Sequence, residues 1–334
     1  MRAALVGLGT TGAHLARQLI QSPFTTIALH DSDEHRRRRV VSAVRAVVPS
    51  TVEVTDEPPD RDDPPDVVVI ASPTGTHLRL ASAMMEAGSN VVSLADDPGE
   101  VEVLLALDRA ATAAGRSVVV GAGFAPGLSC LLARYAADQL DTVDVISVYK
   151  AGTGGPACAR QHHRALQGSG HEWIDGAWVL RRGGSGRDLA WFPEPFGARD
   201  CYRAALPSPM LLQRQYPEAR RISARMAATR RDRLTAGLPM LRPPHEDGGP
   251  GAVRVEVRGR VGRAAETVIL GVMDHPSVAA ATVAAVAAAE SAAGRAPVGA
   301  HGLAHWDDPR PILSELRRRG VKVASFAGLL DPVA

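Results

Sequence analysis

A glycine-rich turn near the start of the chain constrains the fold more than any other feature. The apolar run at 3–6 is typical of a short strand, and it leads directly into GLGTTG at 7–12 and then a helical apolar pattern. Glycines at these three places permit a tight turn, close approach of a pyrophosphate, and packing of the helix on the strand. The start of the helix also attracts phosphate through its N–H groups. We therefore expect a nucleotide to bind along this turn, at Gly7, Gly9, Thr10, Thr11 and Gly12.

An acidic residue follows the second predicted strand, which covers 26–30. Asp31 lies about 20 residues beyond the glycines, where a carboxylate accepts hydrogen bonds from the adenosine ribose. Such a carboxylate repels the 2′-phosphate of NADP, whereas a neighbouring arginine can bind it. Arginines fill positions 36–39, and we expect them to form the exposed face of a helix. The predicted cofactor is therefore NAD or NADP, with NAD favoured.

Strand and helix patterns continue to alternate through the first third of the chain. Apolar strand patterns at 66–71, 90–94 and 117–121 are separated by helical ones. This alternation predicts a parallel sheet with helices on both faces, and ligands bind beyond the carboxyl ends of such strands. The polar residues at these ends are further candidates for cofactor binding, with the first three on the nicotinamide side: Ser72, Thr74, His77 and Asp96.

The later part of the chain predicts a second domain with a different kind of sheet. From 171 to 272 short strand patterns alternate with turns, which is typical of an antiparallel or mixed sheet. Because such a sheet often forms a dimer face, we expect a homodimer. A helix at 309–319 and a strand at 321–325 are expected to return to the first domain.

The predicted fold class is therefore α/β, with a parallel N-terminal sheet and a mixed α+β second domain. An alanine-rich helix is expected at 276–294. The predicted domains are a dinucleotide-binding Rossmann domain at 1–126, a substrate and dimerisation domain at 127–280, and a C-terminal segment that packs back on the first domain at 281–334.

Lysine is nearly absent from this chain, which has Lys150 and Lys322 against 36 arginines. Where any positive charge suffices, the sequence uses arginine. A lysine can exchange a proton near neutral pH when buried, which arginine cannot do. Lys150 follows a predicted strand at 143–149, and we expect it to act as a general acid or to hold a substrate carbonyl or carboxylate. The alternative is a surface lysine at a strand end; Lys322 is expected to be structural.

A glycine-rich segment with further polar candidates follows Lys150 and is predicted to be a loop. His162 and His163 are candidate proton donors or substrate-orienting groups. Because neighbouring side chains of a strand point to opposite sides, at most one of them is expected to face a site. The alternative is that they are loop histidines in solvent. The sequence leaves open whether 150–164 is the catalytic loop.

Three further places are candidate substrate contacts. A helix is predicted at 127–140, and the N–H groups of Gly127, Leu128 and Ser129 at its start form a carboxylate site or simply begin a helix that crosses between domains. Arg160 lies in the glycine-rich segment. The segment 199–202 begins with an arginine, which pairs bidentately with carboxylates. The substrate is therefore expected to be a small molecule that bears a carboxylate.

Composition excludes several other classes of protein. Three cysteines, Cys130, Cys158 and Cys201, form no CxxC pair, so neither a disulfide framework nor a cysteine zinc site is expected. The adjacent histidines have no third ligand at metal spacing, so no metal is expected. A net charge of +2 lacks the basic footprint of a nucleic-acid binder, and no apolar run is long enough to span a membrane. With no signal-peptide pattern, a cytoplasmic protein is expected.

Two motifs resemble families of oxidoreductases. The run ASPTGTH at 71–77, followed by Asp96-Asp97-Pro98, resembles the Gfo/Idh/MocA dehydrogenases. That family carries Glu-Lys-Pro at the turn, with a catalytic lysine, and Asp97 stands in its place here. The resemblance implies a Rossmann domain that binds NAD(P).

The run GAGFAPGL at 121–128 resembles instead the G-x-D-P-G-L segment of saccharopine dehydrogenases, with Ala125 in place of the aspartate. The segment at 294–301 also resembles a late segment of that family. This resemblance implies NAD(P)-dependent chemistry at a C–N bond between an amino acid and a carbonyl partner. The leading hypothesis is thus an oxidoreductase for an amino-acid-like or imine substrate. The alternatives are a Gfo/Idh-type dehydrogenase of a sugar, cyclitol or hydroxy acid, and a non-catalytic NAD(P)-binding sensor or scaffold.

Overall fold

The chain forms two compact units in a computed structural model that describes residues 1–240 and 243–326. The first unit consists of Met1–Gly123 and Ser277–Asp307. The second consists of Phe124–Pro276 and the described residues from Asp308 onward. The two segments of the first unit therefore flank residues 124–276 in the sequence. The N-terminal segment ends close to the predicted boundary at 126.

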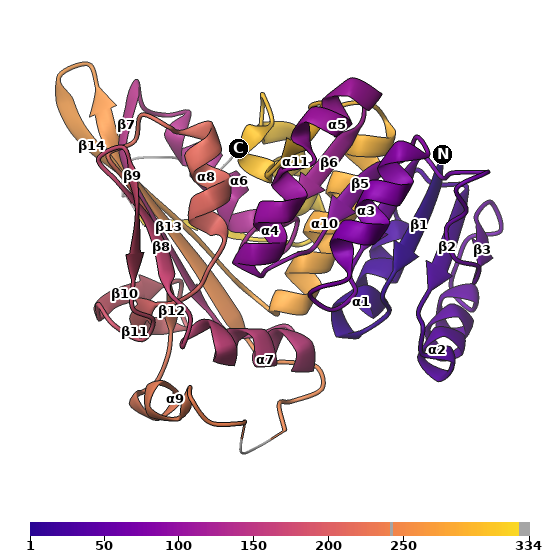
Figure 1. The fold of residues 1–334 in the computed structure, drawn as a ribbon, viewed down its shortest axis with the longest axis horizontal. Coiled ribbons are helices and arrows are strands. Elements are labelled where there is room, and N and C mark those ends of the chain that lie inside the picture. Colours follow the sequence, from indigo (N-terminus) through magenta and orange to yellow (C-terminus); the bar gives the residue numbers. More distant parts are fainter. Residues whose placement is uncertain (241–242, 327–334) are drawn as a thin grey trace. The chain divides into compact units, whose positions relative to one another are not determined.

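The described residues of the first unit contain a seven-stranded sheet in which every pair is parallel. Its strand order is β15-β6-β5-β4-β1-β2-β3 (Figure 1). Strands buried on both faces read as continuous apolar runs, as VVVI at 67–70 does. The strands are β1 (Arg2–Val6), β2 (Thr26–His30), β3 (Glu53–Thr55), β4 (Val67–Ile70), β5 (Asn90–Ser93), β6 (Ser117–Val120) and β15 (Gly299–His301).

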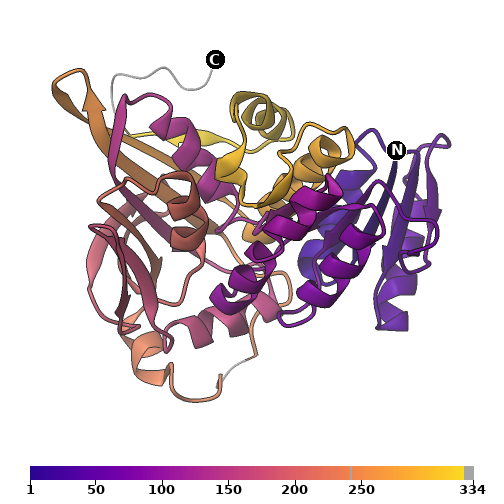
Figure 2. The same cartoon turned by 45° about the horizontal axis from the view of Figure 1, so that its top comes forward.

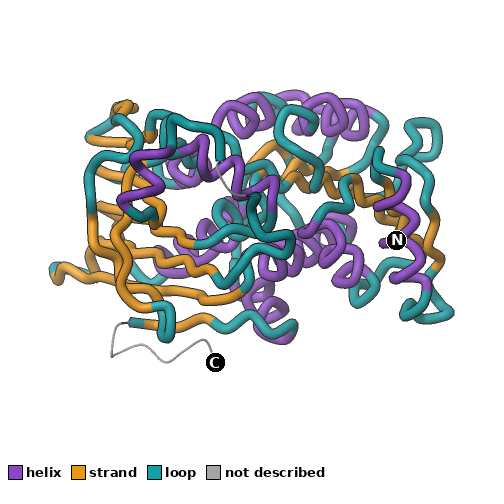
Figure 3. Tube along the Cα trace, turned by 90° about the horizontal axis from the view of Figure 1, so that it is seen from below, coloured by secondary structure: helices purple, strands orange, loops and turns teal. Residues whose placement is uncertain are grey.

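Helices cover this parallel sheet above and below, as the view along its edge shows (Figure 3). They are α1 (Thr10–Leu19), α2 (Glu34–Arg45), α3 (His77–Glu86), α4 (Pro98–Leu105), α5 (Asp108–Ala114) and α10 (Pro276–Ala292), with a 3₁₀ turn η1 (Leu303–His305). The predicted alanine-rich helix is α10, and nearly all of its residues are buried. Small side chains let such a helix pack closely in the interior. Among the described residues, no helix is both long and apolar enough to cross a membrane.

The second unit contains a mixed sheet, as predicted, with nine strands among its described residues. The strands are β7 (Thr142–Ala151), β8 (Gly170–Ile174), β9 (Ala177–Arg181), β10 (Asp188–Phe192), β11 (Gly197–Arg203), β12 (Arg221–Ala227), β13 (Gly251–Val261), β14 (Ala264–Asp274) and β16 (Val323–Ser325). The main path is β10-β11-β12-β7-β13-β14-β16, and the hairpin β8-β9 branches from β12. Strand β7 pairs parallel to β12 and antiparallel to β13, so it lies in the middle.

Helices α6 and α8 pack against strands of this mixed sheet (Figure 2). The helices of the unit are α6 (Leu128–Ala137), α7 (Pro156–Ala165), α8 (Ser208–Gln215), α9 (Arg230–Thr235) and α11 (Arg310–Arg318). Side chains alternate along β7, so Lys150 and Tyr149 lie on opposite faces of the sheet. Tyr149 belongs to an apolar cluster with Phe192 and Cys201.

The prediction for the C-terminal segment is confirmed in part. Helix α10 and strand β15 belong to the first unit, where β15 pairs with β6. The prediction for 309–319 and 321–325 is wrong, because α11 and β16 belong to the second unit. Strand β16 pairs antiparallel with β14, with Gly271 opposite Ala324. The physical reason is the free edge of the long hairpin β13-β14, whose N–H and C=O groups β16 satisfies.

A buried carboxylate ties the hairpin branch to the main sheet. Glu172 of β8 is 1% exposed, and it accepts hydrogen bonds from Arg203 Nε at 2.7 Å and Arg221 Nη2 at 3.2 Å. Arg225 Nη2 lies 3.8 Å from the same carboxylate. Strand β8 pairs with only the first two residues of β12, so these charged groups add contacts that the short ladder lacks.

We expect Glu172→Ala to lower the free energy of unfolding by about 3 kcal/mol, because it removes the buried carboxylate that the largely buried Arg203 and Arg225 share. Urea unfolding followed by circular dichroism measures this change. The control is Glu86→Ala, which removes an exposed ion pair with Arg61 at 3.7 Å and should cost less than about 1 kcal/mol. Equal losses for the two variants would contradict the structural role given to Glu172.

Candidate functional site

The glycine turn of the first unit has the shape that a pyrophosphate requires. Gly7 has φ +98°, and a Cβ there would lie 2.5 Å from Ser72 N. A Cβ on Gly12 would lie 1.9 Å from Gly7 O, so this glycine lets α1 approach β1. A Cβ on Gly9 would meet nothing within 4 Å, and it would stand in open space at the start of α1. A phosphate group fits the space that Gly9 leaves, next to the first N–H groups of the helix.

Asp31 lies at the end of β2 and is tightly held by this same turn. Its Oδ2 accepts a hydrogen bond from Leu8 N at 2.7 Å, and its Oδ1 accepts one from Asp33 N at 2.8 Å. The residue is only 6% exposed. Each carboxylate oxygen has two lone pairs, so acceptor capacity remains for ribose hydroxyls. The position therefore fits the predicted role of Asp31.

Two of the four consecutive arginines also reach Asp31. Arg36 Nη1 lies 3.3 Å from Asp31 Oδ2, and Arg37 Nη1 donates to the Asp31 carbonyl at 3.3 Å. The arginines lie on one helix, as predicted; Arg38 and Arg39 are exposed, whereas Arg36 and Arg37 are half-buried. Helix α2 begins at Glu34, so Arg36 and Arg37 lie near Asp31 in the chain. The negative charge of the Asp31 carboxylate attracts their guanidinium groups.

The loop after β4 is held in place by His77 at the start of α3. His77 is 2% exposed; its Nε2 lies 2.8 Å from Ser72 O and its Nδ1 lies 2.8 Å from Ser93 Oγ. Since a carbonyl only accepts, Nε2 carries the proton and Nδ1 accepts from the serine hydroxyl. His77 therefore positions the loop that carries Ser72 and the exposed Thr74, rather than offering a free nitrogen to a cofactor.

A residue that the sequence analysis missed supports the same loop. Glu100 of α4 is 6% exposed, and its Oε1 accepts hydrogen bonds from Gly75 N at 2.7 Å and His77 N at 3.0 Å. These are N–H groups at the start of α3, which have no partner within the helix. The available signal was an acidic residue at a position of α4 that its apolar neighbours mark as buried.

The turn that resembles Glu-Lys-Pro has a structural role at its second position. Asp97 is the N-cap of α4, and its side chain accepts a hydrogen bond from Glu100 N at 3.1 Å. Pro98 follows as the first residue of the helix, where a missing N–H costs nothing. No lysine therefore stands at this place. Asp96 precedes it and is half-buried, and its contact with the cofactor stays a prediction.

Lys150 is the central polar residue of the second unit. It lies near the end of β7 and is 6% exposed. Its Nζ donates to Ala125 O at 2.9 Å and lies 2.6 Å from His162 Nε2. The prediction of a functional lysine, rather than a surface one, is consistent with this burial. The two acceptors fix the ammonium group at the wall of a cavity.

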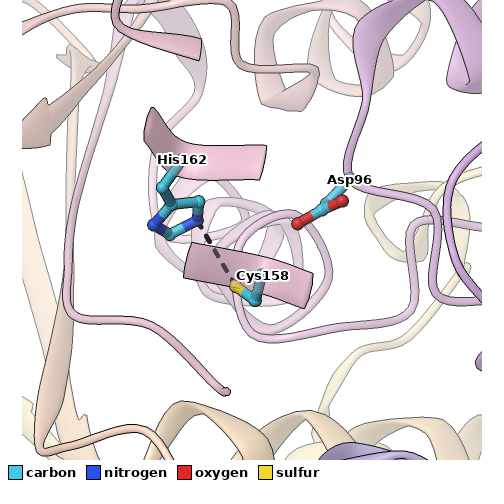
Figure 4. A group of neighbouring side chains, drawn as sticks. All are labelled: Asp96, Cys158 and His162. Carbon is cyan, nitrogen blue, oxygen red and sulfur yellow. Dashed lines mark hydrogen bonds between the residues drawn. The ribbon is translucent and has the colours of Figure 1, made fainter. Parts of the chain in front are cut away.

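His162 lies on a helix and not on the loop that the sequence predicted. Helix α7 begins at Pro156 after Gly155, so only 152–155 are loop. A proline at the first helical position is a common helix start, and this was the overlooked signal. Burial and the positive charge of Lys150 lower the pKa of His162 well below its usual range. Nε2 of the neutral ring therefore accepts a hydrogen bond from Lys150 Nζ. Cys158 Sγ lies 3.6 Å from the same nitrogen (Figure 4).

The neighbouring histidine has a different partner. His163 is half-buried, and its Nε2 lies 2.7 Å from Leu238 O, so it holds the segment that follows α9. On a helix adjacent side chains are about 100° apart, which lets both histidines line one cavity. The expectation that at most one of them faces a site was based on strand geometry and is wrong. Arg160 is exposed on α7, and its contact with substrate stays a prediction.

A cavity of about 270 Å³ lies over this group and is named here the Lys150 cavity. All of its lining residues belong to the second unit. Its lining combines a few polar side chains with apolar ones, as binding sites for small organic molecules do. Its lining includes Lys150, His162, His163, Leu166, Met226 and Asp232.

The start of α6 lies next to the carbonyl that holds Lys150. Gly127 has φ +114° and is the N-cap of α6, and the Leu128 side chain is fully buried. The expectation of a free N–H at Ser129 is wrong, because this group donates to Phe124 O at 3.3 Å. Contact of Gly127 and Leu128 with a substrate stays a prediction.

The fold and the glycine turn define an oxidoreductase-type dinucleotide-binding domain joined to a second unit with a mixed sheet. Residues 1–124 match a family described as "Oxidoreductase family, NAD-binding Rossmann fold", the Gfo/Idh/MocA group. Residues 1–124 thus form an NAD(P)-binding Rossmann domain of the oxidoreductase type, and the predicted Rossmann domain is confirmed.

Solved structures show the same fold over nearly the whole chain. One is the apo histidine-tagged saccharopine dehydrogenase (L-Glu forming) from Saccharomyces cerevisiae, with a TM-score of 0.70, 13% identity, and coverage of 98% of this chain and 100% of that one. Another is the amine dehydrogenase from Mycobacterium smegmatis, with a TM-score of 0.53, 14% identity, and coverage of 92% and 96%. At these identities the likeness concerns the fold.

The lowered pKa of His162 gives the stability a pH dependence. Below pH about 6.5 the unfolded chain protonates this histidine while the folded protein keeps it neutral, so stability falls as the pH drops. His162→Gln removes this contribution. Its free energy of unfolding should decline less steeply from pH 6.5 downward, by up to about 1.4 kcal/mol per pH unit.

Urea unfolding of both proteins at several pH values measures this difference in slope. Burial also lowers the pKa values of His30 and His301, but both histidines remain in each protein and cancel in the comparison. Identical slopes for the two proteins would show that the folded protein does not keep His162 neutral.

Proposed function

We propose that this protein is an NAD(P)-dependent oxidoreductase that transfers hydride to or from a C–N bond of an amino-acid-like or imine substrate. The observation that carries the proposal is the Lys150–His162 pair, 2.6 Å apart at the wall of a cavity, in a chain whose first unit is an NAD(P)-binding domain. When bound, the nicotinamide supplies or takes up the hydride. A residue of the second unit donates or accepts the proton.

Lys150 acts as the general acid in the direction of reduction. When hydride reaches an imine carbon, the electron pair of the C=N bond moves to nitrogen, which then takes a proton from Nζ. In the oxidation direction the neutral amine of Lys150 receives that proton. Positioned proton transfer of this kind contributes about 10²- to 10⁴-fold to a rate.

His162 and Ala125 position the lysine. Both accept hydrogen bonds from Nζ, so they set its direction within the cavity. His162 resists protonation in its buried place, and the proton therefore remains on Lys150 until a substrate takes it. His163 contributes by holding the segment around Leu238 at the cavity. A bound carboxylate finds its counterpart in the N–H groups at the start of α6, near Gly127 and Leu128.

The cofactor preference that we propose is NAD over NADP. The proposal is supported by the buried Asp31 carboxylate at the end of β2, since a carboxylate at this place of a dinucleotide-binding fold accepts from the ribose and repels a 2′-phosphate. Arg36 is already engaged by that carboxylate and by Asp33, which reduces its availability for a phosphate. The proposal rests on this pairing.

Lys150→Ala should lower turnover by about 10²- to 10⁴-fold while cofactor binding persists, because the variant lacks only the proton donor. The assay follows absorbance at 340 nm with NADH or NADPH and pooled 2-oxo acids and amines. Lys322→Ala is the matched control, since it removes the other lysine, which is exposed, and should leave turnover unchanged. Undiminished turnover in Lys150→Ala would exclude the role of this lysine.

The same assay separates the competing functions. Turnover only with NAD⁺ or NADP⁺ and pooled sugars or cyclitols would favour a Gfo/Idh-type dehydrogenase. Tight cofactor binding with no turnover in any pool would favour a sensor or scaffold protein.

Asp31→Asn should reduce the preference for NADH over NADPH by at least about tenfold, because the neutral amide no longer repels the 2′-phosphate. Its remaining oxygen still accepts the Leu8 hydrogen bond. Calorimetric titration with each cofactor measures the ratio of dissociation constants. Glu86→Gln, which neutralises an exposed carboxylate at the end of α3, is the control and should leave this ratio unchanged. An equal preference in wild type and Asp31→Asn would contradict the assignment.

A further inference from the structure

The outer edge of the β8–β9 hairpin is open. Among the residues that the structure describes, β9 pairs only with β8, and the hairpin branches from one side of β12. Four of the five residues of β9 are exposed. An edge strand presents N–H and C=O groups that another strand can pair with. The backbone of β9 therefore has room for a further strand beside it.

The turn of the hairpin decides which backbone groups of β9 point outward. Residues 175–176 form a two-residue turn with positive φ at both positions, and the strand residues on either side of it lie opposite each other. In such a hairpin the pair next to the turn is hydrogen-bonded, and hydrogen-bonded pairs then alternate along the ladder. Val179 therefore directs its N–H and C=O toward β8, whereas Trp178 and Leu180 direct theirs outward.

Trp178 and Leu180 also carry large apolar side chains on this edge. They are 42% and 62% exposed, and they lie on the same face because side chains alternate along a strand. The Trp178 ring is held edge-to-face by the Trp173 ring of β8, with 5.3 Å between the ring centroids. A tryptophan that is held in place by a neighbour is suited to anchor a protein interface.

The devices that normally protect an edge strand are absent from β9. Proline, lysine and bulges prevent another strand from pairing. The strand reads AWVLR, so it has no proline or lysine, its register with β8 is regular, and its one charged residue stands at its end. The edge is therefore open to pairing along its length.

The sequence around β9 is complementary to itself when it runs in the opposite direction. Two β9 strands can pair antiparallel with Val179 opposite the partner's Val179. This register places Trp178 opposite the partner's Leu180, and the reverse. It also brings Arg182 next to the partner's Asp175, and both of these residues are exposed. Apolar side chains thus meet apolar ones, and each positive charge meets a negative one.

We propose that β9 is the contact strand of a homodimer, in which it pairs antiparallel with β9 of a second copy about a two-fold axis at Val179. The outward N–H and C=O groups of Trp178 and Leu180 then exchange hydrogen bonds with those of the partner, and the mixed sheet continues from one copy into the other. The predicted homodimer thus forms through an edge of this sheet rather than a face. Neither cofactor nor substrate takes part, so the dimer is tested separately from the proposed function.

Sedimentation velocity of the full-length protein over a range of concentrations measures its oligomeric state. The wild type should sediment as a dimer and Leu180→Glu as a monomer, because a carboxylate in the apolar contact loses its hydration. Leu234→Glu is the matched control, since it places the same charge at a leucine of α9 that is exposed and lies outside the hairpin. This control should remain a dimer, and circular dichroism establishes that each variant is folded.

A charge reversal tests the ion pair between the copies. Arg182→Glu should raise the dissociation constant of the dimer at least tenfold, because it opposes the partner's Asp175 with a like charge. Asp175→Asn should raise it less, because this variant loses the attraction without gaining a repulsion, and asparagine tolerates the positive φ of the turn. Arg231→Glu, at an exposed arginine of α9, is the control and should leave the dissociation constant unchanged.

Val179→Cys tests the register. Opposed residues of a non-hydrogen-bonded pair have Cα atoms about 4.5 Å apart, a distance that a disulfide spans. The oxidised variant should therefore run as a covalent dimer on a non-reducing gel. Val261→Cys, at an exposed position at the end of β13, is the control and should run as a single chain, as should the wild type.

Three results would overturn the proposal. The first is a wild type that stays monomeric at every concentration. The second is a dimer that persists in folded Leu180→Glu and Arg182→Glu proteins, which would assign the interface to another surface. The third is a Val179→Cys protein that forms the dimer without cross-linking.

Discussion

The second unit depends on the alternation of side chains along its central strand. Strand β7 pairs with β12 on one side and β13 on the other, so its residues have no freedom to change face without breaking both ladders. Lys150 is thereby fixed toward α7, while Tyr149 is fixed on the opposite face, where its hydroxyl donates to Asp188 at 2.8 Å. A shift of one residue would exchange these two groups and place an ammonium in the apolar cluster around Phe192.

The buried charged groups of residues 1–240 and 243–326 have several partners each. Glu172 has three guanidinium groups around it, Asp31 has two backbone N–H groups and Arg36, and Glu100 caps the start of a helix. Lys150 Nζ donates to Ala125 O at 2.9 Å and lies 2.6 Å from His162 Nε2, so the buried ammonium is likewise held by more than one group.

The sequence was most informative where chain geometry is local. The glycine turn, Asp31 and the parallel strands were predicted because turn chemistry and apolar runs depend on neighbouring residues. The alanine-rich α10 was predicted for the same reason. Lys150 was singled out by composition, because an amine that persists in an arginine-rich chain points to a task that arginine cannot perform.

Contacts between segments that are distant in the sequence were not predicted. The edge pairing of β16 with β14 joins residues about fifty positions apart, and nothing in either segment specifies the partner. Glu100 and His77 are 23 residues apart and act on one loop, which only the fold reveals. The segment 156–165 was taken for a loop because its glycines come first; the helix begins only after them. The Lys150 cavity likewise draws on β7, α7 and β12, which are separate in the sequence.

The scarcity of lysine has a practical consequence for spectroscopy. The chain has two ε-amino groups, one buried at Lys150 and one exposed at Lys322. Reductive methylation with ¹³C-labelled formaldehyde therefore places labels on two side chains and the α-amino group, and each gives its own resonance. The signal of the buried amine lies beside an imidazole ring, whose current shifts it away from the exposed one. The chemical shift of this label therefore reports on the surroundings of the Lys150 amine.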